Sequence, residues 1–150
     1  MTQRRASRLI RIGGVVVGGD APITVQSMTK TDTRDTAATV DQIKGLEECG
    51  CELIRVAVPD MAAAQAIATI KRSINIPIIA DIHFDYRLAM AALEASVDGL
   101  RLNPGNIGDK DQIKTIVRAA KERAVPIPIW VNSGSLPKED VKASSVAERT

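Results

Sequence analysis

Strand-like and helix-like segments alternate along most of the chain, and this alternation limits the fold more than any other feature of the sequence. Five apolar, strand-like segments have centres near residues 26, 55, 80, 101 and 130. Segments with apolar residues at helical spacing separate them. Units of this kind form right-handed crossovers and a parallel sheet. Because polar residues cluster at the carboxyl ends of the strands, where barrel enzymes hold their active sites, we expect an α/β fold of the parallel (β/α) barrel type.

The length of the chain limits how much of a barrel it can form. A complete eight-stranded barrel typically needs about 250 residues, whereas this chain has 150. We therefore expect a partial barrel with about five of the eight strands. The expected strands are Ile23–Ser27, Leu53–Val58, Ile78–His83, Gly99–Asn103 and Val125–Asn132.

Aspartates and one glycine mark the expected ends of the helices. An aspartate carboxylate accepts hydrogen bonds from the first turn of a helix, so we expect helices to begin at Asp35 or Thr36, at Asp60 and at Asp85. Gly50 is expected to end the first of them. The last helix has the clearest apolar stripe. Its members are Ile113, Ile116, Val117 and Ala120.

The pattern divides the chain into three parts. Residues 1–22 are expected to form an N-terminal segment with a β-hairpin, because Ile10–Ile12 and Val15–Val17 flank a Gly13-Gly14 pair. Residues 23–136 are expected to form the partial barrel, which would bind the substrate. Residues 137–150 form a polar tail, after which the remaining barrel strands would follow.

Composition excludes several classes of function. A formal net charge of +2 argues against a nucleic-acid-binding surface. No apolar stretch approaches the 18–20 or so residues of a membrane span, so we expect no membrane association. The only cysteines, Cys49 and Cys51, are too few for a metal cage and too close for an easy disulfide. A reducing, cytoplasmic location is the expectation.

Several polar residues share the strand face that lies opposite the aliphatic side chains. Alternation along the strands places Arg55, Asp81, His83 and Arg101 on the face toward the barrel interior. Asn103 and Asn132 follow the same alternation. Two interpretations stay open: the arginines pair with Asp81 and Asp85 in a structural network, or they bind an anionic ligand through their guanidinium groups.

The run Asp81-x-His83-x-Asp85 has the composition of a metal site. The chain contains no second histidine, however, and Asp85 is also placed to cap a helix. A hydrogen-bonding or proton-donating role for His83 is therefore the better hypothesis than metal binding.

Six separated motifs resemble one known family. In order they are Val25-Gln26-Ser27-Met28-Thr29, Thr31-Asp32-Thr33-Arg34-Asp35, Arg55-Val56-Ala57-Val58-Pro59-Asp60, Ala80-Asp81-Ile82-His83-Phe84-Asp85-Tyr86-Arg87, Arg101-Leu102-Asn103-Pro104-Gly105-Asn106-Ile107-Gly108 and Val131-Asn132-Ser133-Gly134-Ser135-Leu136. Together they resemble the N-terminal part of the 4-hydroxy-3-methylbut-2-enyl diphosphate synthases, oxidoreductases of the non-mevalonate isoprenoid pathway. The resemblance runs from about Ile10 to Leu136.

The resemblance implies a reaction and a set of binding residues. Such enzymes reductively open 2-C-methyl-D-erythritol 2,4-cyclodiphosphate with loss of water. Arg55 and Arg101 would bind the diphosphate, and Asn103 and Asn132 would donate further hydrogen bonds. The polar floor of the pocket would be formed by Asp81, His83 and Asp85. This shifts the balance between the two interpretations of the arginines toward ligand binding.

The resemblance also implies partners that the chain does not contain. The full-length family uses a [4Fe–4S] cluster, reduced by ferredoxin or flavodoxin, and forms homodimers. None of the positions in this chain matches the cluster ligands, so we expect it to be inactive alone. The fifth strand departs from the family: Ile127-Pro128-Ile129-Trp130-Val131-Asn132 stands where the family usually has Ile-Arg-Ile-Gly-Val-Asn. We expect weaker phosphate binding or a displaced strand.

Two other hypotheses stay open at this point. The first is a barrel enzyme of another kind, which binds a pterin as dihydropteroate synthase does. The second is a half-barrel without catalytic activity, which associates with another chain through its unpaired sheet edges.

Overall fold

Four parallel strands and four helices form the main body of the computed structural model, which describes residues 7–83, 85–102 and 109–128. The strands are β3 (Gln26–Met28), β4 (Leu53–Ala57), β5 (Ile78–Ile82) and β6 (Gly99–Leu102), paired in that order. The helices are α1 (Thr36–Glu48), α2 (Met61–Lys71), α3 (Tyr86–Glu94) and α4 (Lys110–Glu122). The expected α/β fold of the barrel type, with a parallel sheet, is confirmed.

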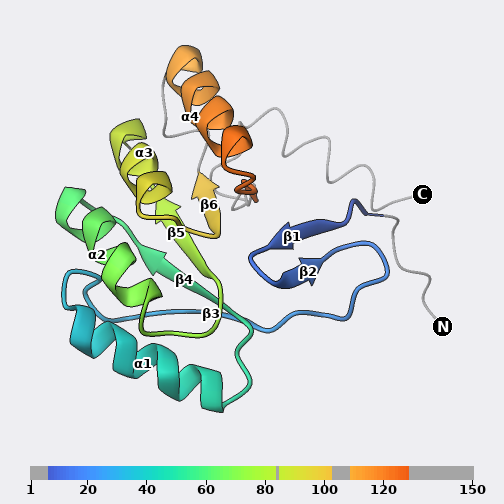
Figure 1. Ribbon diagram of the computed structural model, residues 1–150, viewed down its shortest axis with the longest axis vertical. Coiled ribbons are helices and arrows are strands. Elements are labelled where there is room, and N and C mark those ends of the chain that lie inside the picture. Colours follow the sequence, from blue (N-terminus) through green and yellow to red (C-terminus); the bar gives the residue numbers. More distant parts are fainter. Residues whose placement is uncertain (1–6, 84, 103–108, 129–150) are drawn as a thin grey trace, which may run out of the picture.

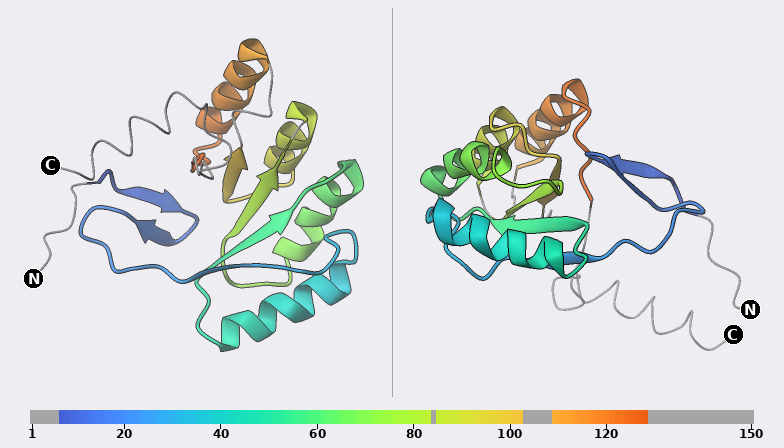
Figure 2. Two further views of the ribbon diagram at one scale, coloured as in Figure 1. Left: turned by 180° about the vertical axis from the view of Figure 1, so that it is seen from behind. Right: turned by 60° about the horizontal axis from the view of Figure 1, so that its bottom comes forward.

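The helices cover one face of the sheet, and the hairpin lies on the other (Figure 1). The hairpin consists of β1 (Ile10–Ile12) and β2 (Val15–Val17), which pair antiparallel as expected. Figure 2 shows the same arrangement from two further directions. No helix among the described residues is both long and apolar enough to cross a membrane.

The helices begin at the aspartates that the sequence indicated. The carboxylates of Asp35, Asp60 and Asp85 each accept a hydrogen bond from a backbone N–H of the following first turn. Asp109 does the same for α4. After α1, Gly50 has a φ of +87°, which is the left-handed conformation that glycine adopts without strain.

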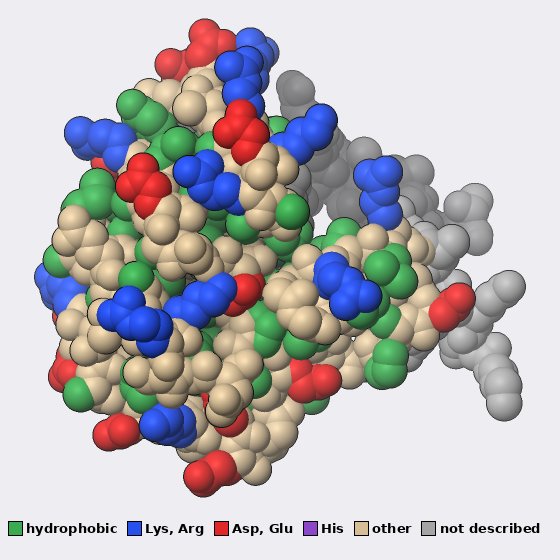
Figure 3. Space-filling view, viewed as in Figure 1, with side chains coloured by type: hydrophobic (Ala, Val, Ile, Leu, Met, Phe, Trp, Pro, Cys, Tyr) green, Lys and Arg blue, Asp and Glu red, His purple; other side chains and the backbone are tan. Residues whose placement is uncertain are grey.

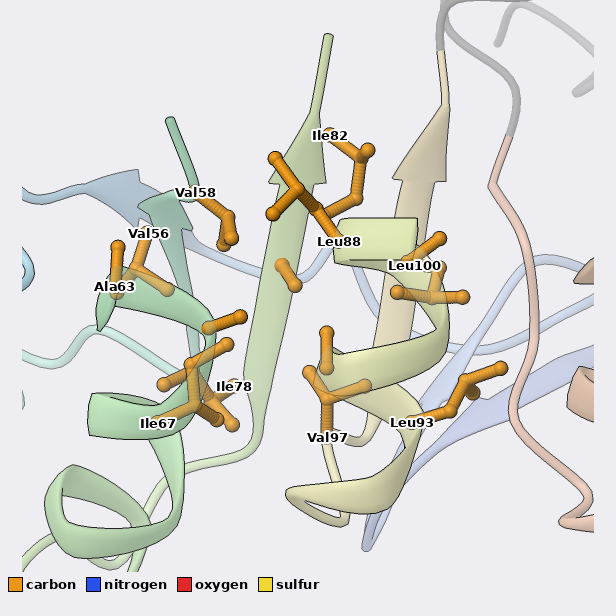
Figure 4. Close-up of a cluster of buried hydrophobic side chains, with 14 of the residues drawn as sticks. Val56, Val58, Ala63, Ile67, Ile78, Ile82, Leu88, Leu93, Val97 and Leu100 are labelled. Atoms are coloured by element: carbon orange, nitrogen blue, oxygen red, sulfur yellow. The ribbon is translucent and has the colours of Figure 1, made fainter. Parts of the chain in front are cut away.

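The main core lies between the strands and the helices (Figure 4). Alternate residues of β4, such as Ile54 and Val56, are fully buried there, and Leu100 of β6 lies on the same side. Helix α2 contributes Ala63 and Ile67. The aliphatic face of each of these strands is therefore the helix side, as the alternation predicted.

A second, smaller core lies on the opposite, inner face of the sheet. Ile12 of the hairpin packs there against Leu53 of β4 and Ile79 of β5. Gly99 of β6 makes room for this contact, since a Cβ at that position would lie 3.4 Å from Ile12 Cγ2 and 3.3 Å from Ile79 Cγ1. The hairpin thus covers the amino-terminal part of the inner face.

The fifth strand is the main departure from the expected elements. Residues 125–128 form no strand, and the rest of the segment expected to reach Asn132 lies outside the described residues. The N–H of Leu100 still donates to the carbonyl of Pro126 at 3.0 Å. Pro126 and Pro128 carry no N–H, so neither can donate to a ladder with β6.

Two smaller expectations were also wrong. The first barrel strand covers Gln26–Met28 rather than Ile23–Ser27. Val117 of the expected stripe on α4 is 48% exposed, whereas Ile116 and Ala120 are buried. The buried face of α4 therefore follows Ile116 and Ala120, and Val117 lies at its solvent side.

Candidate functional site

Three charged side chains lie on the inner face of the sheet, two residues beyond the inner core along each strand. Arg55 follows Leu53, Asp81 follows Ile79, and Arg101 follows Gly99. Residues two apart on a strand share a face, so the apolar and the charged positions both point inward. Asp81 and Arg101 are paired in register across β5 and β6. The sequence folds this way because the aliphatic residues between them enter the main core.

Asp81 lies between the two arginines. Its Oδ1 accepts a hydrogen bond from Arg101 Nη1 at 2.8 Å, and its Oδ2 lies 3.3 Å from Arg55 Nε. The Asp81 side chain is 2% exposed and that of Arg101 is 9% exposed, whereas that of Arg55 is 24% exposed. The buried aspartate therefore anchors a buried arginine, and Arg55 is the more accessible cation.

The cluster carries more positive than negative charge. One carboxylate faces two guanidinium groups, so the three side chains together have a net charge of +1. Arg101 Nε is buried, and it has no hydrogen-bond partner among the described residues. A buried donor of this kind is costly to leave unpaired. The arrangement therefore suits the binding of an anion next to the two guanidinium groups.

Met28 contacts Arg55, which sequence reasoning missed. Met28 of β3 is paired in register with Arg55 of β4. Its Sδ accepts from Arg55 Nε at 3.3 Å and from Nη2 at 3.2 Å. Thr33 was missed as well, and its Oγ1 donates to the carbonyl of Ala57 at 2.6 Å. The motif around Met28 was visible in the sequence, but the strand register that pairs it with Arg55 was not.

His83 and Asp85 lie at the carboxyl end of β5 but differ in their contacts. His83 Nε2 is 3.8 Å from Asp81 Oδ1, and its side chain is 42% exposed. Asp85 instead caps α3 and forms an ion pair with Arg87 at 2.7 Å. Hydrogen bonds from the side chain and backbone of Arg87 lower the pKa of Asp85. Of the two acids in the network interpretation, Asp81 therefore pairs with both arginines, whereas Asp85 pairs with Arg87.

A hollow of about 670 Å³ adjoins these residues, between the ends of β4 and β5 and the first turns of α2 and α3. His83, Asp85 and Arg87 line it together with Asp60 and Leu88. Asn103 and Asn132, the two remaining expected site residues, lie outside the described residues.

The described residues hold no group of three or more side chains placed to bind a metal ion. Cys49 follows α1 and is exposed, whereas the thiol of Cys51 is buried and donates to the carbonyl of Leu53 at 3.1 Å. Both lie near the amino ends of the strands, away from the arginines. They do not provide the set of thiolates that an iron–sulfur cluster needs.

Charged side chains of both signs are interspersed over the helix side of the molecule (Figure 3). The arginine cluster on the inner face differs because its two cations share one acid, and that acid and Arg101 are buried.

Comparison with known proteins identifies the family. A family profile described as the GcpE TIM-barrel domain matches residues 7–149. The chain belongs to this family.

Curated relatives of the family are similar over most of the chain. A protein of Dehalococcoides mccartyi (strain BAV1), named 4-hydroxy-3-methylbut-2-en-1-yl diphosphate synthase (flavodoxin), is 60% identical over 99% of this chain. A protein of the same name from Geobacter sulfurreducens is 62% identical over 89% of it. The chain spans 43% and 38% of the lengths of these two relatives.

Solved structures confirm the fold alone. Dihydropteroate synthase of Xanthomonas albilineans, solved with 4-aminobenzoic acid, has a TM-score of 0.62 and 16% identity, covering 93% of this chain and 57% of that protein. The enzyme of Yersinia pestis has the same TM-score with 11% identity, covering 93% and 53%. At such identity, the likeness does not favour the pterin hypothesis.

Proposed function

We propose that this chain forms the diphosphate-binding part of a flavodoxin-dependent 4-hydroxy-3-methylbut-2-en-1-yl diphosphate synthase. Its ligand would be 2-C-methyl-D-erythritol 2,4-cyclodiphosphate. The observation that carries the proposal is the pair of inward-facing arginines that share one buried aspartate. Family membership and the names of relatives about 60% identical support it.

The chemistry of the cluster fits a diphosphate. Guanidinium groups present N–H donors in a planar fork that matches phosphate oxygens. Asp81 accepts a hydrogen bond from Nη1 of Arg101, and the buried Nε of Arg101 has no hydrogen-bond partner among the described residues. The low dielectric of the adjoining apolar core strengthens the attraction between these cations and an anion. In this proposal Arg55 and Arg101 bind the diphosphate, and Asp81 positions both.

The remaining expected residues complete the proposed pocket. His83 and Asp85 would lie at its rim, and both line the hollow next to α2 and α3. Asn103 and Asn132 would donate hydrogen bonds to the ligand.

The electron-transfer half of the reaction belongs to other parts of the proposed enzyme. Opening the cyclic diphosphate with loss of water consumes two electrons, which ferredoxin or flavodoxin would supply through a [4Fe–4S] cluster. The two cysteines of this chain do not fit such a cluster, so no step of that chemistry is assigned to its residues. We place the complete enzyme in the cytoplasm, as a homodimer.

Ligand binding tests the proposal. Isothermal titration of the 150-residue chain with the cyclodiphosphate is expected to show binding that weakens by about tenfold or more in Arg55→Met and in Arg101→Met, since each loses charge-assisted hydrogen bonds. Arg72→Met, at the far end of α2, is the matched control and is expected to bind normally. Circular dichroism checks that each variant is folded. Equal binding by all four proteins would contradict the proposal.

Two further measurements separate the alternatives. A pterin diphosphate is expected not to displace the cyclodiphosphate, and efficient displacement would favour the pterin hypothesis. With reduced flavodoxin and cyclodiphosphate, the chain alone is expected to yield no product. A stable monomer in sedimentation would argue against a half-barrel that exists only by association.

A further inference from the structure

Met28 holds a position next to the more exposed of the two arginines. Its thioether sulfur lies 3.3 Å from Arg55 Nε and 3.2 Å from Nη2. The two residues are register partners on adjacent strands, so the backbone itself brings them together. Met28 is half-buried, and the contact is thus part of the sheet rather than a chance surface approach.

The ion pair of Arg55 with Asp81 is longer than that of Arg101 with Asp81. Arg101 Nη1 lies 2.8 Å from Asp81 Oδ1, whereas Arg55 Nε lies 3.3 Å from Asp81 Oδ2. The Arg55 side chain is also more exposed, at 24% compared with 9%. A long arginine side chain has many rotamers, and contacts that fix its orientation before a ligand binds lower the entropy that binding costs.

A thioether can hold a guanidinium group in one orientation without preventing that group from binding an anion. Sulfur is a weak, polarisable hydrogen-bond acceptor without charge. It occupies two donor positions of Arg55 and fills the space beside the guanidinium, but it does not neutralise the positive charge. A carboxylate at the same place would compete with the diphosphate for Arg55.

We infer that Met28 is a positioning residue for Arg55, fixing the orientation in which the guanidinium receives the diphosphate. This inference rests on the proposed function. Met28 does not itself bind the ligand through a charge or a strong donor, and its effect on affinity passes through Arg55.

Binding measurements on three variants test the inference. Met28→Leu keeps the side-chain volume and removes the sulfur. We expect its affinity for 2-C-methyl-D-erythritol 2,4-cyclodiphosphate to fall about three- to tenfold, which is the size of a modest hydrogen bond. Met28→Glu is expected to bind more weakly still, because its carboxylate pairs with Arg55. Met90→Leu on α3 is the matched control and is expected to bind as the unchanged chain does.

A double-mutant cycle separates positioning from a general structural effect. If Met28 acts through Arg55, then Met28→Leu combined with Arg55→Met binds no more weakly than Arg55→Met alone. Additive losses, or unchanged binding by Met28→Leu, would overturn the inference while leaving the proposed function intact. If the unchanged chain does not bind the cyclodiphosphate, the proposed function fails and this inference falls with it.

A second substitution keeps the test decisive if Met28→Leu does not fold. Met28→Gln restores a side-chain acceptor at nearly the same length. Binding close to that of the unchanged chain supports the inference, and binding as weak as that of Arg55→Met overturns it. Thermal unfolding followed by circular dichroism shows which variants are folded.

Discussion

At the scale of single residues, the ion pair between Asp81 and Arg101 differs from the others in the described part of the chain because both of its side chains are buried. Lys114 and Asp111 on α4 also form an ion pair, at 2.9 Å, but both side chains are more than three-quarters exposed. Exposed pairs contribute little because water screens them. Removing one partner of a buried pair leaves an uncompensated charge in the interior.

Replacement of Asp81 by asparagine is therefore expected to destabilise the fold strongly. Asp81→Asn leaves the buried Arg101 without its counter-charge, and we expect the free energy of unfolding to fall by about 3–5 kcal/mol. Urea denaturation followed by circular dichroism measures the change. Asp111→Asn is the control, with an expected change below about 0.5 kcal/mol. Equal effects of the two substitutions would show that the Asp81 cluster is not buried as described.

The ion pair between Asp32 and Arg34 makes the stability of the fold depend on pH, and the direction of this dependence can be predicted. Hydrogen bonds from the Arg34 side chain and backbone lower the pKa of Asp32 to about 2 from its usual 3.8. Because the pKa of Asp32 is lower in the folded than in the unfolded chain, the ion pair stabilises the fold fully at pH values above the unfolded pKa of 3.8. This stabilisation is lost as the pH falls from 3.8 through about 2.

The expected outcome is that Asp32→Asn is less stable than the unchanged chain near neutral pH and that the difference disappears below about pH 2. Urea titrations at several pH values measure it. The effect is small because the pair is exposed. Asp41→Asn, on the exposed side of α1, serves as the control. A difference that persisted unchanged below about pH 2 would exclude this ion pair as its origin.

Sequence reasoning predicted the residues of the site better than their contacts. Alternation along β4, β5 and β6 was enough to place Arg55, Asp81 and Arg101 on one face. It could not distinguish Asp81 from Asp85 as the partner of the arginines, because that depends on the local turn that commits Asp85 to capping α3. The contact between Met28 and Arg55 depends on strand register, which a single sequence does not specify.

At the scale of secondary structure elements, glycine positions separate into those that need glycine and those that do not. Gly45 lies in the middle of α1, and nothing lies within 4 Å of the place where its Cβ would be. Gly18 has a φ of +86°, and a Cβ there would collide with the carbonyl oxygen of Arg8.

Alanine substitution at these two glycines is expected to have opposite effects. Gly45→Ala should raise the free energy of unfolding by about 0.5–1 kcal/mol, because alanine is the better helix former. Gly18→Ala should lower it by about 1 kcal/mol or more, since the left-handed backbone and the collision both oppose a side chain. Thermal unfolding measures both. A gain in stability at Gly18 would contradict the described turn.

The helix ends were predictable and the last strand was not, for a physical reason. A cap is a local interaction between an aspartate and the next few backbone N–H groups, so sequence spacing reveals it. A strand depends on a distant partner. The segment 125–128 is apolar enough to be a strand, but Pro126 and Pro128 remove alternate donors from its ladder.

At the scale of the whole molecule, the hairpin and the sheet form one packed unit through Ile12. This side chain is 2% exposed and contacts Leu53 and Ile79. Val16 belongs to the same hairpin but lies outside this inner core, across from Arg11.

Truncation of Ile12 tests how far the hairpin stabilises the barrel strands. Ile12→Ala is expected to cost about 2–4 kcal/mol, because it leaves a cavity between the hairpin and the inner face. Val16→Ala is the control, with an expected cost below about 1 kcal/mol. Chemical denaturation monitored by circular dichroism compares them. Equal, small effects would indicate that the hairpin does not support the sheet.

The contact between Ile12 and the glycine at position 99 has a consequence for the order of folding. Ile12 is made early during synthesis, yet the surface that receives it is complete only once β6 has formed, far along the chain. Contacts of such long sequence separation are slow to form. We therefore expect the hairpin to dock after the strands of the sheet have paired. Weakening its contact would accelerate unfolding while leaving the refolding rate nearly unchanged.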